Sequence, residues 1–189
     1  ILYRLVGSEM CIRDSNNTYI LNQKVVVDAG ATLTIEAGTV IKGSAGAGSL
    51  ASALVVARGG QIFANGTADA PIIMTSVADN LDGNLDPSSP DTQGLWGGLL
   101  VLGNAPCSFE GDVVEAQIEG IPADDTFGLY GGNDPSDNSG VITYVSVRHG
   151  GAVIGENNEI NGITLGGVGN GTVIENIEVV ANSDDGIEF

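Results

Sequence analysis

The sequence predicts an all-β fold, a parallel β-helix or β-solenoid, on three observations. Glycine contributes 29 of the 189 residues, and Val, Ile and Thr are frequent, which is typical of short strands separated by tight turns. The segments 25–39 and 54–67 begin 29 residues apart and share one pattern, an aliphatic strand, a Gly turn and a second short strand. Apolar and polar residues alternate within these segments, as expected for strands with one buried face.

A second pair of similar segments favours a solenoid over other β architectures. Residues 142–147 and 174–179 carry related strand patterns 32 residues apart. Short strands of this kind cannot bury an apolar face alone, whereas stacked coils join their faces into one core. A sandwich or barrel would show strands about 8–12 residues apart without this longer period.

Two segments, 77–95 and 106–139, interrupt the repeat. They hold most of the Asp and Pro residues of the chain. We predict that they are loops inserted between the coils of a β-helix that spans residues 16–189. Long loops on a rigid scaffold often carry binding and catalytic residues.

Residues 1–15, ILYRLVGSEMCIRDS, differ in character from the rest of the chain. One interpretation is an N-terminal cap of the β-helix. The other is a non-native segment, because the string resembles the translated sequencing-adapter peptide found at the ends of proteins predicted from assembled environmental DNA. The second interpretation explains the change in character better, so residues 1–15 are left out of the functional reasoning.

The chain is strongly acidic, with a formal net charge of −18. This charge is unchanged when the two basic and two acidic residues of 1–15 are left out. Such a surface repels nucleic acid and anionic membranes and attracts cations. Because the sequence also has no apolar run of the roughly 20 residues that span a bilayer, we expect neither a nucleic-acid partner nor membrane insertion.

A set of ordered phrases resembles a known family of proteins. The phrases are AGATLTIEAGT (29–39), GLWGGL (94–99), QIEGI (117–121), GLYGG (128–132), VRHGG (147–151) and EINGITLGGV (159–168). Together they are similar to bacterial secreted or cell-surface β-helix proteins of pectin-lyase-like fold, which often carry C-terminal secretion-sorting domains. The resemblance implies a right-handed β-helix, an extracellular or cell-surface location, and further coils of the parent chain beyond Phe189. We therefore expect a solenoid truncated at both ends.

Four aspartates in or beside the first inserted loop suggest a calcium site. Asp79, Asp82, Asp86 and Asp91 offer the carboxylate oxygens that Ca²⁺ requires in sets of about six to eight. The spacing is not that of an EF-hand. The alternative is a solvated turn in which these side chains accept hydrogen bonds from their own backbone.

Arg148 and His149 are candidates for the base of a polysaccharide lyase, which abstracts a proton next to a carboxylate. His149 is the only histidine of the chain. Strand alternation places His149 in phase with Val147 and toward the core, and Arg148 toward solvent. The alternative for His149 is a structural role at the end of a strand, unless the following Gly-Gly turn rotates it outward.

Asp184, Asp185 and Glu188 are candidate carboxylates of a glycoside hydrolase, in which one carboxyl group must stay protonated while the other is ionised. Strand phase would direct Asp185 into the core, and the high cost of burying an unpaired carboxylate favours a turn instead. Trp96 and Tyr130 lie beside Gly-Gly pairs, where they either stack on a sugar ring or pack against the turn.

These observations predict a non-catalytic extracellular or cell-surface β-solenoid module that serves surface attachment or glycan contact, with a possible Ca²⁺ ligand. The first alternative is a polysaccharide lyase or glycoside hydrolase of pectin-lyase-like fold. An inert structural spacer is the second. Fold alone does not decide among them.

Overall fold

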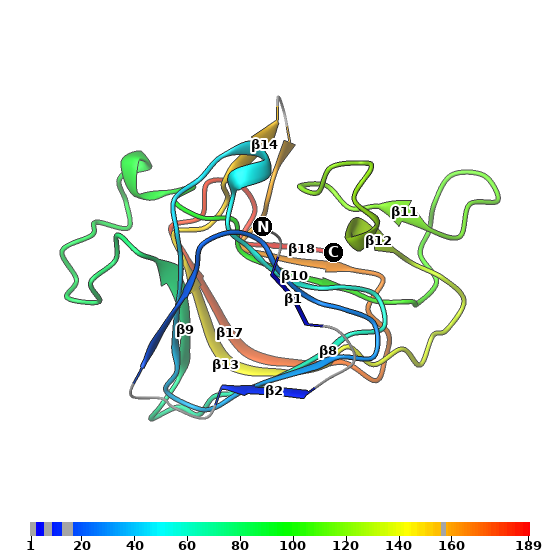
Figure 1. The fold of residues 1–189 in the computed structure, drawn as a ribbon, viewed down its shortest axis with the longest axis horizontal. Helices are drawn as coiled ribbons and strands as arrows, with labels where there is room; N and C mark the ends of the chain where they lie inside the picture. The colour runs from blue at the N-terminus through cyan, green and yellow to red at the C-terminus, as the bar shows by residue number, and fades with distance from the viewer. Residues whose placement is uncertain (1–2, 6–8, 13–16, 156–157) are drawn as a thin grey trace.

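A computed structural model describes residues 3–5, 9–12, 17–155 and 158–189 of the chain. In this part the chain winds through successive coils of short parallel strands that enclose a roughly triangular core (Figure 1). The prediction of an all-β parallel solenoid is confirmed. No helix in the described ranges is long and apolar enough to cross a membrane.

One side of the triangle, the first face, is a sheet whose strands pair in the order of the coils. Its strands are β1 (Tyr3–Leu5), β4 (Val25–Val27), β7 (Leu54–Val56), β10 (Leu99–Leu102), β16 (Ile163–Gly166) and β18 (Ile187–Glu188). Every pair is parallel and in register, for example Val26 with Val55 and Leu100 with Val55. Each coil therefore adds one strand to this face.

The other two sides, the second and third faces, belong to one sharply bent sheet. The second face contains β2 (Glu9–Ile12), β5 (Thr32–Ile35), β8 (Gln61–Asn65) and the first halves of β13 (Gly140–Arg148) and β17 (Val173–Val180). The third face contains β3 (Thr18–Leu21), β6 (Val40–Gly43), β9 (Ile72–Ser76) and the second halves of β13 and β17.

In β13 and β17 the corner between the second and third faces is made by a single residue in the left-handed region. Tyr144 has φ 49° and Asn176 has φ 54°. Pairing of β13 with β17 continues on both sides of this position, from Thr143 with Glu175 to Val145 with Ile177. The two long strands therefore turn the corner without a loop.

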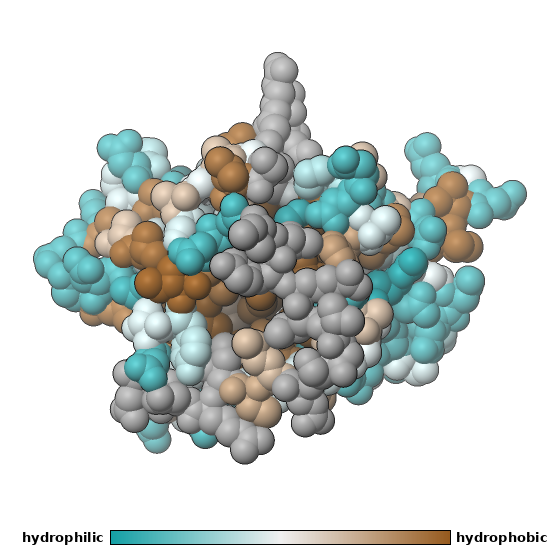
Figure 2. Space-filling model, viewed as in Figure 1, coloured by the Kyte–Doolittle hydropathy of each residue, from teal (hydrophilic) through white to brown (hydrophobic). Residues whose placement is uncertain are grey.

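The remaining elements lie in the connections between coils. They are η1 (Gly48–Leu50), η2 (Pro90–Thr92), η3 (Thr126–Gly128), β11 (Ala116–Gln117), β12 (Leu129–Tyr130), β14 (Val153–Gly155) and β15 (Asn158–Glu159). The two longest connections, 77–98 and 103–139, project on opposite sides of the coil in Figure 1. Hydrophilic residues gather over both of them in Figure 2.

Two apolar clusters hold the fold together. The first fills the interior of the coil with residues such as Leu33, Ile62 and Val147. The second lies outside the first face, where Val55 and Leu100 pack with residues of the 103–139 connection. The strands of the first face are thus buried on both sides, so buried and partly exposed residues do not alternate along them as they do in β5 and β8.

Residues 3–5 and 9–12 pair in parallel with β4 and β5. They occupy the position of a first coil at this end of the solenoid. Strand pairing does not show whether residues 1–15 belong to the natural protein, so the non-native character of this segment stays a prediction.

Candidate functional site

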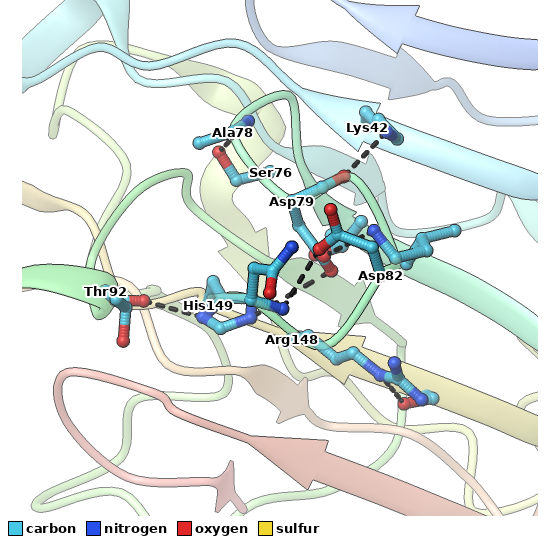
Figure 3. Close-up of polar contacts among 12 residues, drawn as sticks. Lys42, Ser76, Ala78, Asp79, Asp82, Thr92, Arg148 and His149 are labelled. Carbon is cyan, nitrogen blue, oxygen red and sulfur yellow. Dashed lines mark hydrogen bonds and ion pairs between the residues drawn. The ribbon is translucent and has the colours of Figure 1, made fainter. Parts of the chain in front are cut away.

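The most densely hydrogen-bonded group of candidate residues lies where the 77–98 connection covers the end of the third face (Figure 3). His149 follows the last residue of β13, and its Nδ1 lies 2.7 Å from the carbonyl oxygen of Thr92. Its Nε2 lies 3.9 Å from Oδ2 of Asp79. The same Oδ2 accepts a hydrogen bond from Thr75 Oγ1, and Lys42 donates to the carbonyl oxygen of Asp79.

His149 does not point into the apolar core as strand alternation predicted. Its φ of 59° places it in the left-handed region, which ends the alternation of β13 and turns the side chain toward the 77–98 connection. The backbone therefore rotates the His149 side chain away from the core, as the alternative with a turn allowed, but the rotation occurs at His149 itself and not in the following Gly-Gly turn. The side chain remains inaccessible, because the residue is only 4% exposed.

The contacts of His149 define its hydrogen-bonding role. A carbonyl oxygen can only accept, so the proton between His149 and Thr92 must be on Nδ1. The backbone of His149 also accepts a hydrogen bond from Leu95 N and donates one to Val180 O. His149 thus joins the 77–98 connection to two coils, a role that needs no contact with a substrate.

Arg148 points outward, as alternation predicted, and is engaged by its neighbours. Its Nε donates to Ser146 Oγ at 2.8 Å, and its Nη2 lies 3.3 Å from Oε2 of Glu178 on the next coil. Arg148 and His149 therefore lie next to each other in sequence but have separate sets of partners. The structure does not bring them together around one accessible point.

The aspartates of the first loop fall into two environments. Asp79 is buried at 5% exposure, whereas Asp82 and Asp86 accept hydrogen bonds from the backbone of Asn84 and Ser88 in exposed turns. These bonds lower the pKa of both exposed carboxyls, with the backbone bond as the largest cause. Asp91 lies in η2. The described residues contain no group of three or more His, Cys, Asp or Glu that could hold a metal ion, and calcium binding stays a prediction.

The carboxylates near the C-terminus lie around Asn161, a buried residue with 4% exposure. Asn161 donates to Oε2 of Glu188 at 2.6 Å and accepts from the backbone N of Asp185 at 2.9 Å. Asp184 and Asp185 are exposed and precede β18. The side chain of Asp185 is therefore outside the core, in a turn.

Glu119, on the 103–139 connection, joins this group of carboxylates. Glu119 is exposed; desolvation raises the pKa of its carboxyl, and the charges of Glu188, Glu159 and Asp184 raise it further. Glu119 and Glu159 were not predicted from the sequence, because these four carboxylates come from three segments that are distant along the chain. The only available signal was the presence of both in phrases shared with the resembled family.

Trp96 packs inside the protein and presents no ring face to a sugar. It has no exposed surface, and its Nε1 donates to the carbonyl oxygen of Arg148 at 2.7 Å. A Cβ added to Gly43 would lie 2.6 Å from the Trp96 ring, so glycine is needed opposite the indole. Sugar stacking by Trp96 is incompatible with this placement.

Tyr130 is partly buried in the outer apolar cluster. Its ring lies over Gly166 and meets Phe109 edge-on, with ring centroids 5.4 Å apart. Burial raises its pKa, with smaller contributions from Cys107 and Glu188. Packing therefore accounts for Tyr130, although part of the side chain remains exposed.

Three basic residues, Lys24, Lys42 and Arg58, share one role. Lys24 pairs with Asp125 at 2.7 Å, and Arg58 pairs with Glu115 at 2.7 Å and donates to the carbonyl oxygen of Gly131. Both ion pairs attach the 103–139 connection to the coil, as Lys42 attaches the 77–98 connection. These pairings could not be predicted from the sequence, because each partner lies far away along the chain.

Coils of parallel strands that form three faces define this protein as a parallel β-helix. Its sequence matches, over residues 6–189, the family described as the pectate-lyase like beta helix domain. The chain therefore belongs to this family of right-handed β-helices. Searches of curated proteins and of solved structures found no match.

Proposed function

We propose that this domain is a non-catalytic β-solenoid module that contacts glycans outside the cell or at its surface. The proposal rests on one observation: each basic side chain in residues 17–189 has a partner within the fold. Lys24, Arg58 and Arg148 form ion pairs within the fold, and Lys42 donates to a backbone carbonyl. A polysaccharide lyase needs cationic groups that are free to neutralise the substrate carboxylate and to abstract its proton.

The net charge supports the same proposal. A chain of charge −18 repels uronate polymers, and its paired cations do not offset this repulsion at an open site. His149 is the remaining candidate base, and its 4% exposure keeps a polymer from reaching it. Both features argue against elimination chemistry, and a non-catalytic contact with a glycan is the proposal that remains compatible with them.

A glycoside hydrolase is the second candidate, and the environment of Glu119 favours it. Hydrolysis needs a protonated carboxyl group close to an ionised one. The pKa of the exposed Glu119 carboxyl is shifted upward by desolvation and by the charges of Glu188 and Glu159, which is the direction that a catalytic acid needs. If this site is catalytic, Glu119→Gln abolishes the release of reducing ends while the fold is retained.

Product analysis separates the candidates. The protein is incubated with pectate, alginate and neutral glycans in the presence of calcium, and unsaturated and reducing ends are measured. The proposal predicts glycan binding without new ends. Unsaturated ends would indicate a lyase, reducing ends a hydrolase, and the absence of both binding and turnover an inert spacer.

A further inference from the structure

The second face of the solenoid differs from the other two in what covers it. The 103–139 connection packs on the outside of the first face, and the 77–98 connection is anchored at the third face through Thr75 and Lys42. Figure 1 shows neither connection across the side formed by β2 and β8. The outward side chains of the second face therefore remain accessible.

A continuous row of uncharged side chains crosses this accessible face. Register pairing aligns Thr34 with Phe63, Phe63 with Val141 and Val141 with Val173. The first three are half-buried and Val173 is 39% exposed. Strands about 4.8 Å apart make this outer row roughly 14 Å long.

Polar but uncharged side chains border the outer row. Asn65 and Thr143 form the next outward pair toward the corner. On the last coil the residue in register with Thr143 is Glu175, which is charged. The uncharged area is therefore centred on β8 and β13. On a chain of charge −18, an uncharged area of this kind is a distinct surface.

The chemistry of the row suits a sugar polymer. A pyranose ring has an apolar C–H face, which stacks on an aromatic ring or on aliphatic groups, and a rim of hydroxyl groups. Phe63 and Val141 offer the apolar surface, while the Asn65 amide and the Thr143 hydroxyl offer donors and acceptors for the rim.

The size and charge of the row argue against other occupants. An area roughly 14 Å by 7 Å is on the order of 100 Å², far below the roughly 800 Å² that each partner buries in a stable protein interface. Anionic polymers are repelled by the surrounding acidic surface. An extended neutral glycan needs neither a large area nor a cation.

We propose that the outer row of Thr34, Phe63, Val141 and Val173 binds a neutral polysaccharide strand, an inference that rests on the proposed glycan contact. Phe63 is the central stacking residue, because it is the only aromatic in the row and has row members on both sides.

Affinity gel electrophoresis tests the inference with two neutral polymers, glucomannan and hydroxyethyl cellulose, and two anionic ones, polygalacturonate and alginate. The wild-type protein is compared with Phe63→Ala and Val173→Asp. Phe109→Ala is the matched control, since Phe109 is also half-buried but lies on the 103–139 connection. We expect Phe63→Ala to weaken binding to a neutral polymer about tenfold, Val173→Asp to weaken it as well, and Phe109→Ala to leave it unchanged.

The outcomes distinguish the inference from the function on which it rests. Neutral binding that survives both changes in the row, or that is lost in Phe109→Ala, overturns the inference and leaves glycan contact standing. Preference for the anionic polymers also overturns the inference alone. Failure of the wild-type protein to bind any of the four polymers overturns the proposed function. Should Phe63→Ala lose its thermal unfolding transition, the Val173→Asp variant decides the matter, because its side chain is exposed.

Discussion

Replacing Ile121 with alanine tests whether the 103–139 connection is part of the folded core. Ile121 is 3% exposed and packs in the outer apolar cluster on the first face. Truncation of a buried Ile to Ala lowers the free energy of unfolding by about 2–5 kcal/mol, because apolar contacts are lost and a cavity remains. In a domain of this size the melting temperature falls by roughly 4–20 °C.

Val113→Ala is the control, since Val113 lies on the same connection and is 55% exposed. A surface substitution of this kind changes the free energy of unfolding by about 0.5 kcal/mol or less. Urea unfolding of the two variants measures the difference. Equal stability of the Ile121 and Val113 variants would refute the reasoning and would make the connection a loosely attached loop.

The remaining predictions concern the third face, the turns, the open edge and calcium. His149→Phe removes the donor to Thr92 and should cost about 1–3 kcal/mol, with faster proteolysis within 77–98; cleavage at the wild-type rate would contradict the contact. The largest cause of the lowered pKa is the Ser136 hydroxyl for Asp134 and the Ser88 backbone N–H for Asp86. In NMR titrations Ser136→Ala should therefore remove the larger contribution and raise the Asp134 pKa toward 3.8, whereas Ser88→Ala should leave the larger contribution at Asp86 in place. Because both pKa values are lowered by folding, the stability that these turns contribute is present above the ordinary carboxyl pKa and is lost as the pH falls through the lowered pKa. An Asp134 pKa that stays unchanged in Ser136→Ala would be inconsistent with the assigned cause. β17 lies at the edge of the bent sheet and Phe189 is 93% exposed. Because an unpaired strand edge can pair with another molecule, light scattering should show concentration-dependent association that Val179→Lys reduces. A monodisperse monomer would argue against association through this edge. The calcium hypothesis predicts a higher melting temperature in millimolar calcium, and melting curves that coincide with and without chelator would exclude it.

The strand pattern of the second face could be predicted from the sequence because it obeys simple alternation. Leu33 and Ile35 point inward while Thr34 is partly exposed, and this period of two is visible in the letters. That the first face is covered on its outer side was harder to predict from the sequence. Its runs, such as the four apolar residues of β10, are typical of strands buried on both sides, and this signal could have indicated that something covers them.

The candidate site was less predictable, because its geometry depends on contacts between distant segments. The position of His149 depends on a left-handed backbone conformation, which an L-residue other than glycine adopts rarely and which alternation does not anticipate. The raised pKa of Glu119 depends on carboxylates from two other segments of the chain. Neither the spacing nor the composition of the chain contains this information.

Mass analysis of a neutral oligosaccharide recovered after binding tests the central claim most directly. The oligosaccharide is incubated with the protein, the complex is isolated, and the released glycan is compared with the starting material. A non-catalytic glycan-contacting solenoid returns the oligosaccharide at its original mass. Recovery of shorter products, formed by the wild-type protein and not by Glu119→Gln, would contradict the account and identify a hydrolase.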